Sequence, residues 1–169
     1  MRHLASVAGI CLGLAAVAIA SQAAKGVRDF ASLKTDETME VEFESSGCFN
    51  HDLYSFKFHR GNHPQVTIYN KSRGHLGTIP ITDADLKALD ATLSFYRKNK
   101  GSGCTTTDKI VLKRISKTSV SEEEFTDSSC DLLSREHPEH FPDVARRVAG
   151  TLRFDELVER AIKLRKKSF

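Results

Sequence analysis

The sequence predicts an α+β domain, a two-layer sandwich in which a mainly antiparallel sheet of about five strands packs against two amphipathic helices. Short segments between residues 38 and 126 alternate apolar and polar side chains, which is typical of strands with one buried face. Two other segments, one after residue 82 and one near the end of the chain, have apolar residues at helical spacing. Strands and helices in this order favour an α+β layout.

The first 23 residues have the three parts of a secretory signal peptide. Arg2 makes the start positive, residues 4–20 carry no charged side chain, and small-residue cleavage sites precede Ser21 and Ala24. Residues 4–20 span about 25 Å as a helix, which is short for a bilayer core of about 30 Å. We therefore expect cleavage and export, to the periplasm or the extracellular space.

The remaining chain has the composition of a folded globular protein. Loss of Arg2 with the leader lowers the formal net charge from +3 to +2, so the composition does not favour nucleic acid as a partner. Residues 24–37 are polar and aperiodic and are interpreted as a linker or arm. Residues 38–169 are expected to form a single α+β domain.

The first expected strands form an antiparallel meander. Residues 38–44, 54–59 and 66–70 show the strand pattern, and glycine and proline mark a turn before the third segment. Glutamates alternate with apolar residues along the first strand: Met39, Glu40, Val41, Glu42, Phe43 and Glu44. The outer face is expected to place these glutamates near Lys57 and His59.

A helix is expected to begin at Thr82, whose hydroxyl can cap the first turn together with Asp85, and to end before Gly101. Residues 109–116 and 119–126 are then expected to form a hairpin. Its predicted register pairs Ile115 with Val120, Lys113 with Glu122, and Ile110 with Phe125.

The last part of the chain is expected to contain a second helix. Two prolines make residues 131–150 a loop or short helical turns. Residues 151–167 have the pattern of an amphipathic helix. Its apolar face holds Phe154, Leu157, Val158, Ala161 and Ile162.

Three cysteines remain after cleavage, and an oxidising compartment favours a disulfide between two of them. Cys48 and Cys104 each follow a glycine at an expected strand boundary, and we place this pairing first. Cys104 with Cys130 is the alternative, because it closes the base of the hairpin; Cys48 with Cys130 and no bridge also stay open. There is no C-x-x-C, so the expected role of a bridge is structural.

Histidines are the candidate metal ligands, since neutral imidazole binds zinc. The candidates are His51, His59, His63, His137 and His140. Their spacing matches no H-E-x-x-H motif, and no third ligand follows the last pair at a diagnostic distance. We therefore predict no metal and no cofactor.

No catalytic constellation is recognised. Ser45, Ser46 or Cys48 near a histidine invites a nucleophile hypothesis, but no G-x-S-x-G occurs. The acidic residues of 40–44 alternate onto an exposed strand face, where they keep the strand soluble, and those of 122–124 are likewise not predicted to be catalytic.

The C-terminal helix ends in a basic run formed by Lys163, Arg165, Lys166 and Lys167. Such a run can contact an anionic membrane or an acidic polymer. Cations also favour a helix C-terminus for purely structural reasons, and this interpretation is preferred.

Residues 41–114 contain a strand, Gly47-Cys48-Phe49, a second strand led by Tyr54, a hairpin and a capped helix. In this order of features the chain resembles small exported bacterial domains of unknown function. A second cysteine often follows the first closely in those domains, whereas His51-Asp52 occur here. The resemblance covers about half of the mature chain and transfers no functional residue.

These observations favour an exported, non-enzymatic envelope or extracellular binding module. One candidate partner is another exported protein that pairs with an exposed strand edge; membrane contact is not expected once the leader is removed. One alternative is a small secreted hydrolase, metal-assisted through the histidines. Another is a membrane-surface or polyanion binder that uses the basic C-terminal helix.

Overall fold

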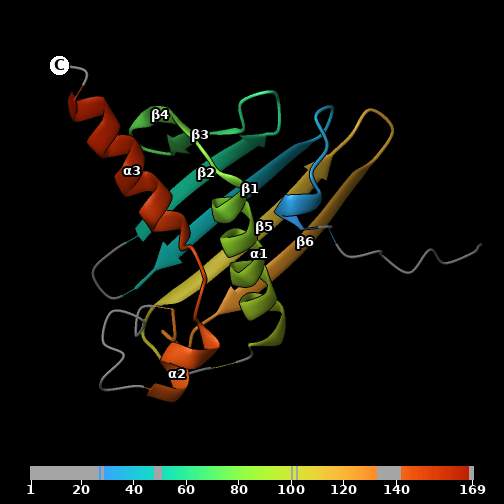
Figure 1. The fold of residues 1–169 in the computed structure, drawn as a ribbon. Coiled ribbons are helices and arrows are strands. Elements are labelled where there is room, and N and C mark those ends of the chain that lie inside the picture. The colour runs from blue at the N-terminus through green and yellow to red at the C-terminus, as the bar shows by residue number, and fades with distance from the viewer. Residues whose placement is uncertain are drawn as a thin grey trace, which may run out of the picture.

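The described residues form an open sheet of six antiparallel strands in the order β4-β3-β2-β1-β5-β6 (Figure 1). Its strands are β1 (Thr38–Ser46), β2 (His51–His59), β3 (Gln65–Asn70), β4 (Gly74–Pro80), β5 (Thr107–Ile115) and β6 (Val120–Asp127). The computed structural model describes residues 27, 29–47, 51–99, 101, 103–132 and 142–167. The predicted leader, Cys48, His137 and His140 lie outside these residues. The predicted α+β class is confirmed, with one strand more than expected.

The additional strand is β4, at one edge of the sheet. Its sequence lacks regular alternation because Gly74 and Gly77 interrupt it and because the pairing with β3 contains a bulge. Gly74 has a φ of 73°, a backbone conformation that glycine adopts readily. Leu76 and Ile79 still point into the core. The bulge and the terminal Pro80 are features that discourage an edge strand from pairing with another chain.

Strands β5 and β6 form the predicted hairpin, and its predicted register is confirmed. The cross-strand pairs include Ile115 with Val120, Lys113 with Glu122, and Ile110 with Phe125. β5 also pairs with β1, so the hairpin extends the meander on the side opposite β4.

Helix α1 (Asp83–Lys98) begins with the predicted capping box. The Asp85 amide donates to Thr82 Oγ1 at 3.1 Å, and the Thr82 amide donates to Asp85 Oδ2 at 2.9 Å. The helix connects the edge strand β4 to β5 and therefore crosses one face of the sheet (Figure 1). Its buried side includes Leu86, Leu89, Leu93 and Tyr96.

Helix α3 (Phe154–Lys167) begins three residues later than predicted. Thr92 of α1 explains the delay, because its Oγ1 accepts from the Leu152 amide at 3.1 Å and donates to the Leu152 carbonyl at 2.7 Å. The short helix α2 (Pro142–Arg147) precedes this segment. None of the helices in the described ranges is long and apolar enough to cross a bilayer.

The two faces of the sheet differ in chemistry. The inner face is apolar and is covered by α1 and α3 (Figure 1). The outer face carries charged pairs, and Lys57 Nζ lies 2.9 Å from Glu40 Oε1, as predicted. His59 instead faces Thr38, with 3.5 Å between its Nδ1 and the Thr38 hydroxyl. Cross-strand charge pairs contribute roughly 0.2–1 kcal/mol each.

Part of the segment predicted as a linker or arm packs into the core. Val27, Phe30 and Leu33 are buried, and Phe30 belongs to the short 3₁₀ helix η1 (Phe30–Ser32). Its ring lies edge-on to Phe58, with ring centroids 4.7 Å apart. Apolar residues three apart in a short polar segment match neither a strand nor a long helix, so the sequence pattern missed this packing.

Arg114 of β5 binds the arm to the sheet through hydrogen bonds and an ion pair. Its side chain is 6% exposed. Its guanidinium donates to the Ser32 carbonyl at 2.7 Å and to Ser32 Oγ at 2.9 Å, and pairs with Glu37. The hydrogen bond from Arg114 lowers the pKa of Glu37 below its usual value. The arm is therefore fixed both by apolar burial and by one buried cation.

The disulfide joins Cys104 and Cys130, whose Cα atoms are 5.7 Å apart. The pairing of Cys48 with Cys104, which we placed first, is therefore wrong, and the alternative pairing is the one observed. Cys104 precedes β5 and Cys130 follows β6, so the hairpin brings the two together, and the Cys104 amide donates to the Ser128 carbonyl at 2.8 Å. The cysteines are 26 positions apart in the sequence, and a closed loop of this length contributes about 3.5 kcal/mol in the chain-entropy model.

Replacement of Arg114 with Met is expected to lower the free energy of unfolding by about 3 kcal/mol, because a buried ion pair loses one partner. Since Glu37 has a lowered pKa, its contribution is present above its usual pKa and is lost as the pH falls. Urea denaturation at several pH values measures both effects. Lys113→Met, one residue away on the outer face, is the control and should cost less than about 1 kcal/mol. Equal losses for the two variants would contradict this account of the arm.

Candidate functional site

The inner face of the sheet changes from apolar to polar two residues beyond Phe43, Tyr54 and Ile110. The next cross-strand neighbours on this face are Asp52 of β2, Ser45 of β1, Asp108 of β5 and Asp127 of β6. We call these four residues the polar row. Three carboxylates are thus aligned across adjacent strands at one end of the core.

Hydrogen bonds connect Asp108 to two neighbouring hydroxyl groups. Ser45 Oγ donates to Asp108 Oδ1 at 2.7 Å, and the Tyr96 hydroxyl of α1 donates to Asp108 Oδ2 at 3.3 Å. The Tyr54 hydroxyl donates to Asp52 Oδ1 at 3.3 Å. Each of these two carboxylates therefore lies beside the hydroxyl of an aromatic ring.

Asp127 is held more deeply, at the edge of the row. Its Oδ1 accepts from Asn99 Nδ2 at 3.0 Å, and its Oδ2 accepts from Ser129 Oγ at 3.0 Å. Both donors come from segments near the disulfide. The negative charge of Asp127 therefore acts on the neighbouring carboxyl group of Asp108.

A cavity of about 190 Å³ lies over three residues of the polar row, Ser45, Asp52 and Asp108. Its lining residues are Phe43, Ser45, Asp52, Tyr54, Tyr96, Thr106, Asp108, Leu132, Arg153, Phe154 and Asp155. The walls thus combine four aromatic rings with three carboxylates and one guanidinium. Thr106 and Leu132 each lie two residues from a disulfide cysteine, so the bridge fixes this part of the wall.

The start of α3 closes the cavity on the side opposite the strands. Phe154 anchors it, with its ring centroid 5.6 Å from that of Phe43 and 5.3 Å from that of Phe56. Arg153 Nε donates to Asp155 Oδ1 at 2.9 Å. Arg153, the only guanidinium among the described lining residues, is therefore paired with a lining carboxylate. Within that described lining, Asp52 and Asp108 remain as the excess negative charge.

The surroundings of Asp108 shift the pKa of its carboxyl group. Burial raises the pKa of this carboxyl group above its usual value of 3.8, and the charges of Asp127 and Asp155 raise it further. The hydrogen bonds from Ser45 and Tyr96 oppose the increase without cancelling it. Acids with a shifted pKa are found often at functional sites, because a cavity that binds or transforms a ligand must bury charge before the ligand arrives.

The two tyrosines remain neutral for a related reason. Burial, followed by the charges of Asp108 and Asp127, raises the pKa of Tyr96 well above 10. Burial and the neighbouring Asp52 raise the pKa of Tyr54. Both rings therefore present uncharged, electron-rich faces and hydroxyl groups near the carboxylates.

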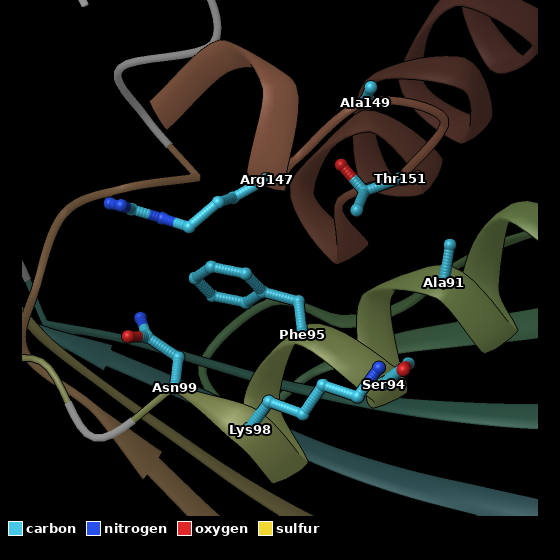
Figure 2. A pocket seen from close by; sticks show the side chains of 8 residues that line it. All are labelled: Ala91, Ser94, Phe95, Lys98, Asn99, Arg147, Ala149 and Thr151. Carbon is cyan, nitrogen blue, oxygen red and sulfur yellow. The ribbon is translucent and has the colours of Figure 1, made fainter. Parts of the chain in front are cut away.

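A second cavity of about 330 Å³ lies between α1 and the segment that follows α2 (Figure 2). Phe95 points into it between Arg147 and Lys98 (Figure 2). Arg147 already pairs with Asp131 at 2.8 Å, and Asn99 uses its amide on Asp127 and Ser129. This cavity is larger, but several of its polar groups are occupied within the protein, so we place the candidate site at the polar row.

The structure does not bring the candidate histidines together. His51 begins β2 and lies 3.7 Å from Glu44, His59 ends β2, and His63 lies in the following turn. No group of three His, Cys, Asp or Glu side chains suited to a metal ion occurs in the described part of the chain. His137 and His140 are outside that part.

Two other motifs also have local explanations. Ser45, considered above as a nucleophile, donates its hydroxyl hydrogen to Asp108 rather than to a histidine. Asn70 of the Asn70-Lys71-Ser72 glycosylation sequon is only 4% exposed, and its Oδ1 accepts from the amides of Ser72 and Arg73. The sequon therefore forms a tight turn in this structure.

No protein-family model matches the chain, and no curated protein matches it. The site is therefore interpreted from its own chemistry. Sequence motifs did not identify Asp52, Asp108 and Tyr96 as site residues, although the period-two pattern of the strands contained a usable indication. On each of three strands, the next inward-facing position after the apolar residues is polar. These positions are Ser45, Asp52 and Asp108.

Replacement of Asp108 with Asn is expected to stabilise the protein at neutral pH by about 1 kcal/mol, as is common when a residue retained for function is removed. Because the pKa of Asp108 is raised in the folded state, ionisation destabilises the wild type as the pH rises through and above 3.8. The two proteins should converge in acid. Thermal unfolding from pH 3 to 8 measures the difference.

Asp36→Asn, which removes an equal charge from an exposed turn, is the control and should change stability by less than about 0.5 kcal/mol. A clear loss of stability in Asp108→Asn at pH 7 would contradict this prediction, because it would show that the carboxylate stabilises the folded protein.

Proposed function

We propose that this chain is an exported, non-enzymatic binding module whose cavity over the polar row takes a small organic cation. The observation that carries the proposal is the juxtaposition of Asp52 and Asp108 with four aromatic rings around one cavity. Carboxylates pair with an ammonium group, and the faces of aromatic rings attract it. The carboxylates and the aromatic rings therefore both favour a positively charged ligand.

The charges of the residues that line the cavity favour a cationic ligand over an anionic one. Arg153 is engaged by Asp155, whereas Asp108 has hydroxyl donors and no cationic partner among the ion pairs of the described residues. An incoming ammonium group stabilises the ionised form of Asp108, which burial disfavours in the empty cavity. An incoming carboxylate meets Asp52 and Asp108, the two lining carboxyl groups that Arg153 does not pair with.

The size of the cavity limits the ligand. At about 190 Å³ it is smaller than the roughly 300–1,000 Å³ typical of drug-sized ligands. It suits a small amine, or one basic side chain of a protein partner. The aromatic walls favour a compact ligand with some apolar surface.

Benzylamine is a suitable probe, with benzyl alcohol and benzoate as neutral and anionic analogues. We expect benzylamine to shift the amide resonances of Ser45, Thr106 and Asp108 in ¹⁵N spectra, and the analogues to shift them far less. Affinity should rise with pH as Asp108 ionises. Loss of one charge-assisted hydrogen bond, worth about 1.5–3 kcal/mol, should weaken binding at least tenfold in Asp108→Asn.

Asp36→Asn should bind benzylamine like the wild type, because its carboxylate lies outside the cavity. Equal shifts with benzyl alcohol would show that the cavity does not select for positive charge, and the proposal would then fail.

Export is part of this proposal. A disulfide between Cys104 and Cys130 is typical of proteins that work in an oxidising compartment. All described core residues follow the predicted cleavage sites, beginning with Val27. Removal of the leader therefore leaves the described core complete.

Protein recovered from its native host is expected to lack 20 or 23 residues by intact mass. Alkylation without reductant should leave Cys104 and Cys130 unmodified. A retained Met1, or alkylation of both cysteines before reduction, would contradict export.

A further inference from the structure

The C-terminal half of α3 and the β3–β4 turn enclose a groove of about 340 Å³. Leu76 and Ile162 supply its apolar surface, and Arg73, Arg165 and Lys166 supply its charge. α3 lies along β4 at this edge of the sheet (Figure 1). The fold thus adds Arg73, far away in sequence, to the basic run at the end of the chain.

The three cations have no acidic partner among the ion pairs of the described residues. Their neighbours on the same helix do: Arg160 Nη1 lies 2.8 Å from Asp85 Oδ1, and Lys163 Nζ lies 3.7 Å from Glu159 Oε2. Positive charge is therefore compensated along the middle of α3 and accumulates at its last turn, where Lys167 adds to it.

The groove combines this charge with apolar surface. Leu76 of β4 and Ile162 of α3 form its apolar wall beside the three cations. A soluble polyanion uses only the cations, whereas a phospholipid offers a phosphate to the cations and acyl carbon to Leu76 and Ile162. The lining of the groove therefore favours a lipid surface as its occupant.

We propose that this groove docks the folded protein on a membrane surface containing anionic phospholipid, with Arg73, Arg165 and Lys166 at the phosphates. Each cation near an anionic surface contributes modestly, so the association is reversible and sensitive to salt. This inference is independent of the organic-cation site, which lies at the opposite end of α3.

The test is sedimentation of protein recovered from its host with vesicles of phosphatidylcholine and phosphatidylglycerol in a 3:1 ratio. We expect binding at 0.1 M salt, loss at 0.5 M salt, and little binding to phosphatidylcholine alone. Arg73→Gln/Lys166→Gln should lower the partition coefficient about 20-fold. The matched control, Lys87→Gln/Lys117→Gln, removes two exposed cations elsewhere and should change it less than twofold.

Ile162→Thr separates lipid from polyanion, because it removes apolar groove surface and keeps every cation. It should weaken vesicle binding and leave retention on heparin unchanged. Equal vesicle binding by the two double variants, or heparin retention without vesicle binding, would overturn the proposal. Benzylamine titration of Arg73→Gln/Lys166→Gln reports separately on the polar row, so failure of one site is distinguishable from failure of the other.

Discussion

The structure depends on how a wide apolar sheet face is covered from one side. Strands of nine residues are about 30 Å long, whereas helices of 16 and 14 residues are about 24 Å and 21 Å long. The helices also lie over different parts of the sheet, since α3 contacts β4 while α1 contacts β6 and η1. The remaining inner surface must be covered by other segments or become polar.

Both solutions occur in this protein. Toward one end of the sheet, the arm inserts Phe30 and Leu33, and the buried Arg114 holds it there. Toward the other end, the apolar face stops at Phe43, and the polar row begins at Ser45. The cavity lies where the cover by α1 and α3 ends, which explains why carboxylates there are only partly buried.

Helix α3 connects the two proposed sites. Its first turn contains Asp155 and Glu156, and its last turn contains Arg165, Lys166 and Lys167. This distribution agrees with the helix dipole, so it contributes to stability independently of any ligand. What the dipole does not explain is the placement of Arg73 beside the last turn, or of Asp52 and Asp108 beside the first. Those placements come from the sheet.

Local patterns predicted the local structure well. Alternation identified β1, β2, β3 and the hairpin, and the Thr82–Asp85 pair located the start of α1, because each of these elements is determined by neighbouring residues. β4 was missed because glycines and a bulge break its period. The arm was missed because its apolar residues are stabilised only by distant partners such as Phe58.

The site and the disulfide were harder to predict for the same reason. Asp52 and Asp108 are 56 positions apart and meet only through the pairing of both strands with β1. Cys104 was assigned first to Cys48 on local context, although the correctly predicted hairpin already favoured Cys130. The register of the β5–β6 hairpin predicted the disulfide partner better than the residues that flank each cysteine.

The most direct measurement is the pKa of Asp108, from the pH dependence of its ¹³Cγ resonance with and without benzylamine. The account predicts a value above the usual 3.8 in the free protein, because burial disfavours the charge. It also predicts a decrease when benzylamine binds, because an ammonium group stabilises the carboxylate. A value at or below 3.8 that benzylamine leaves unchanged would contradict the account.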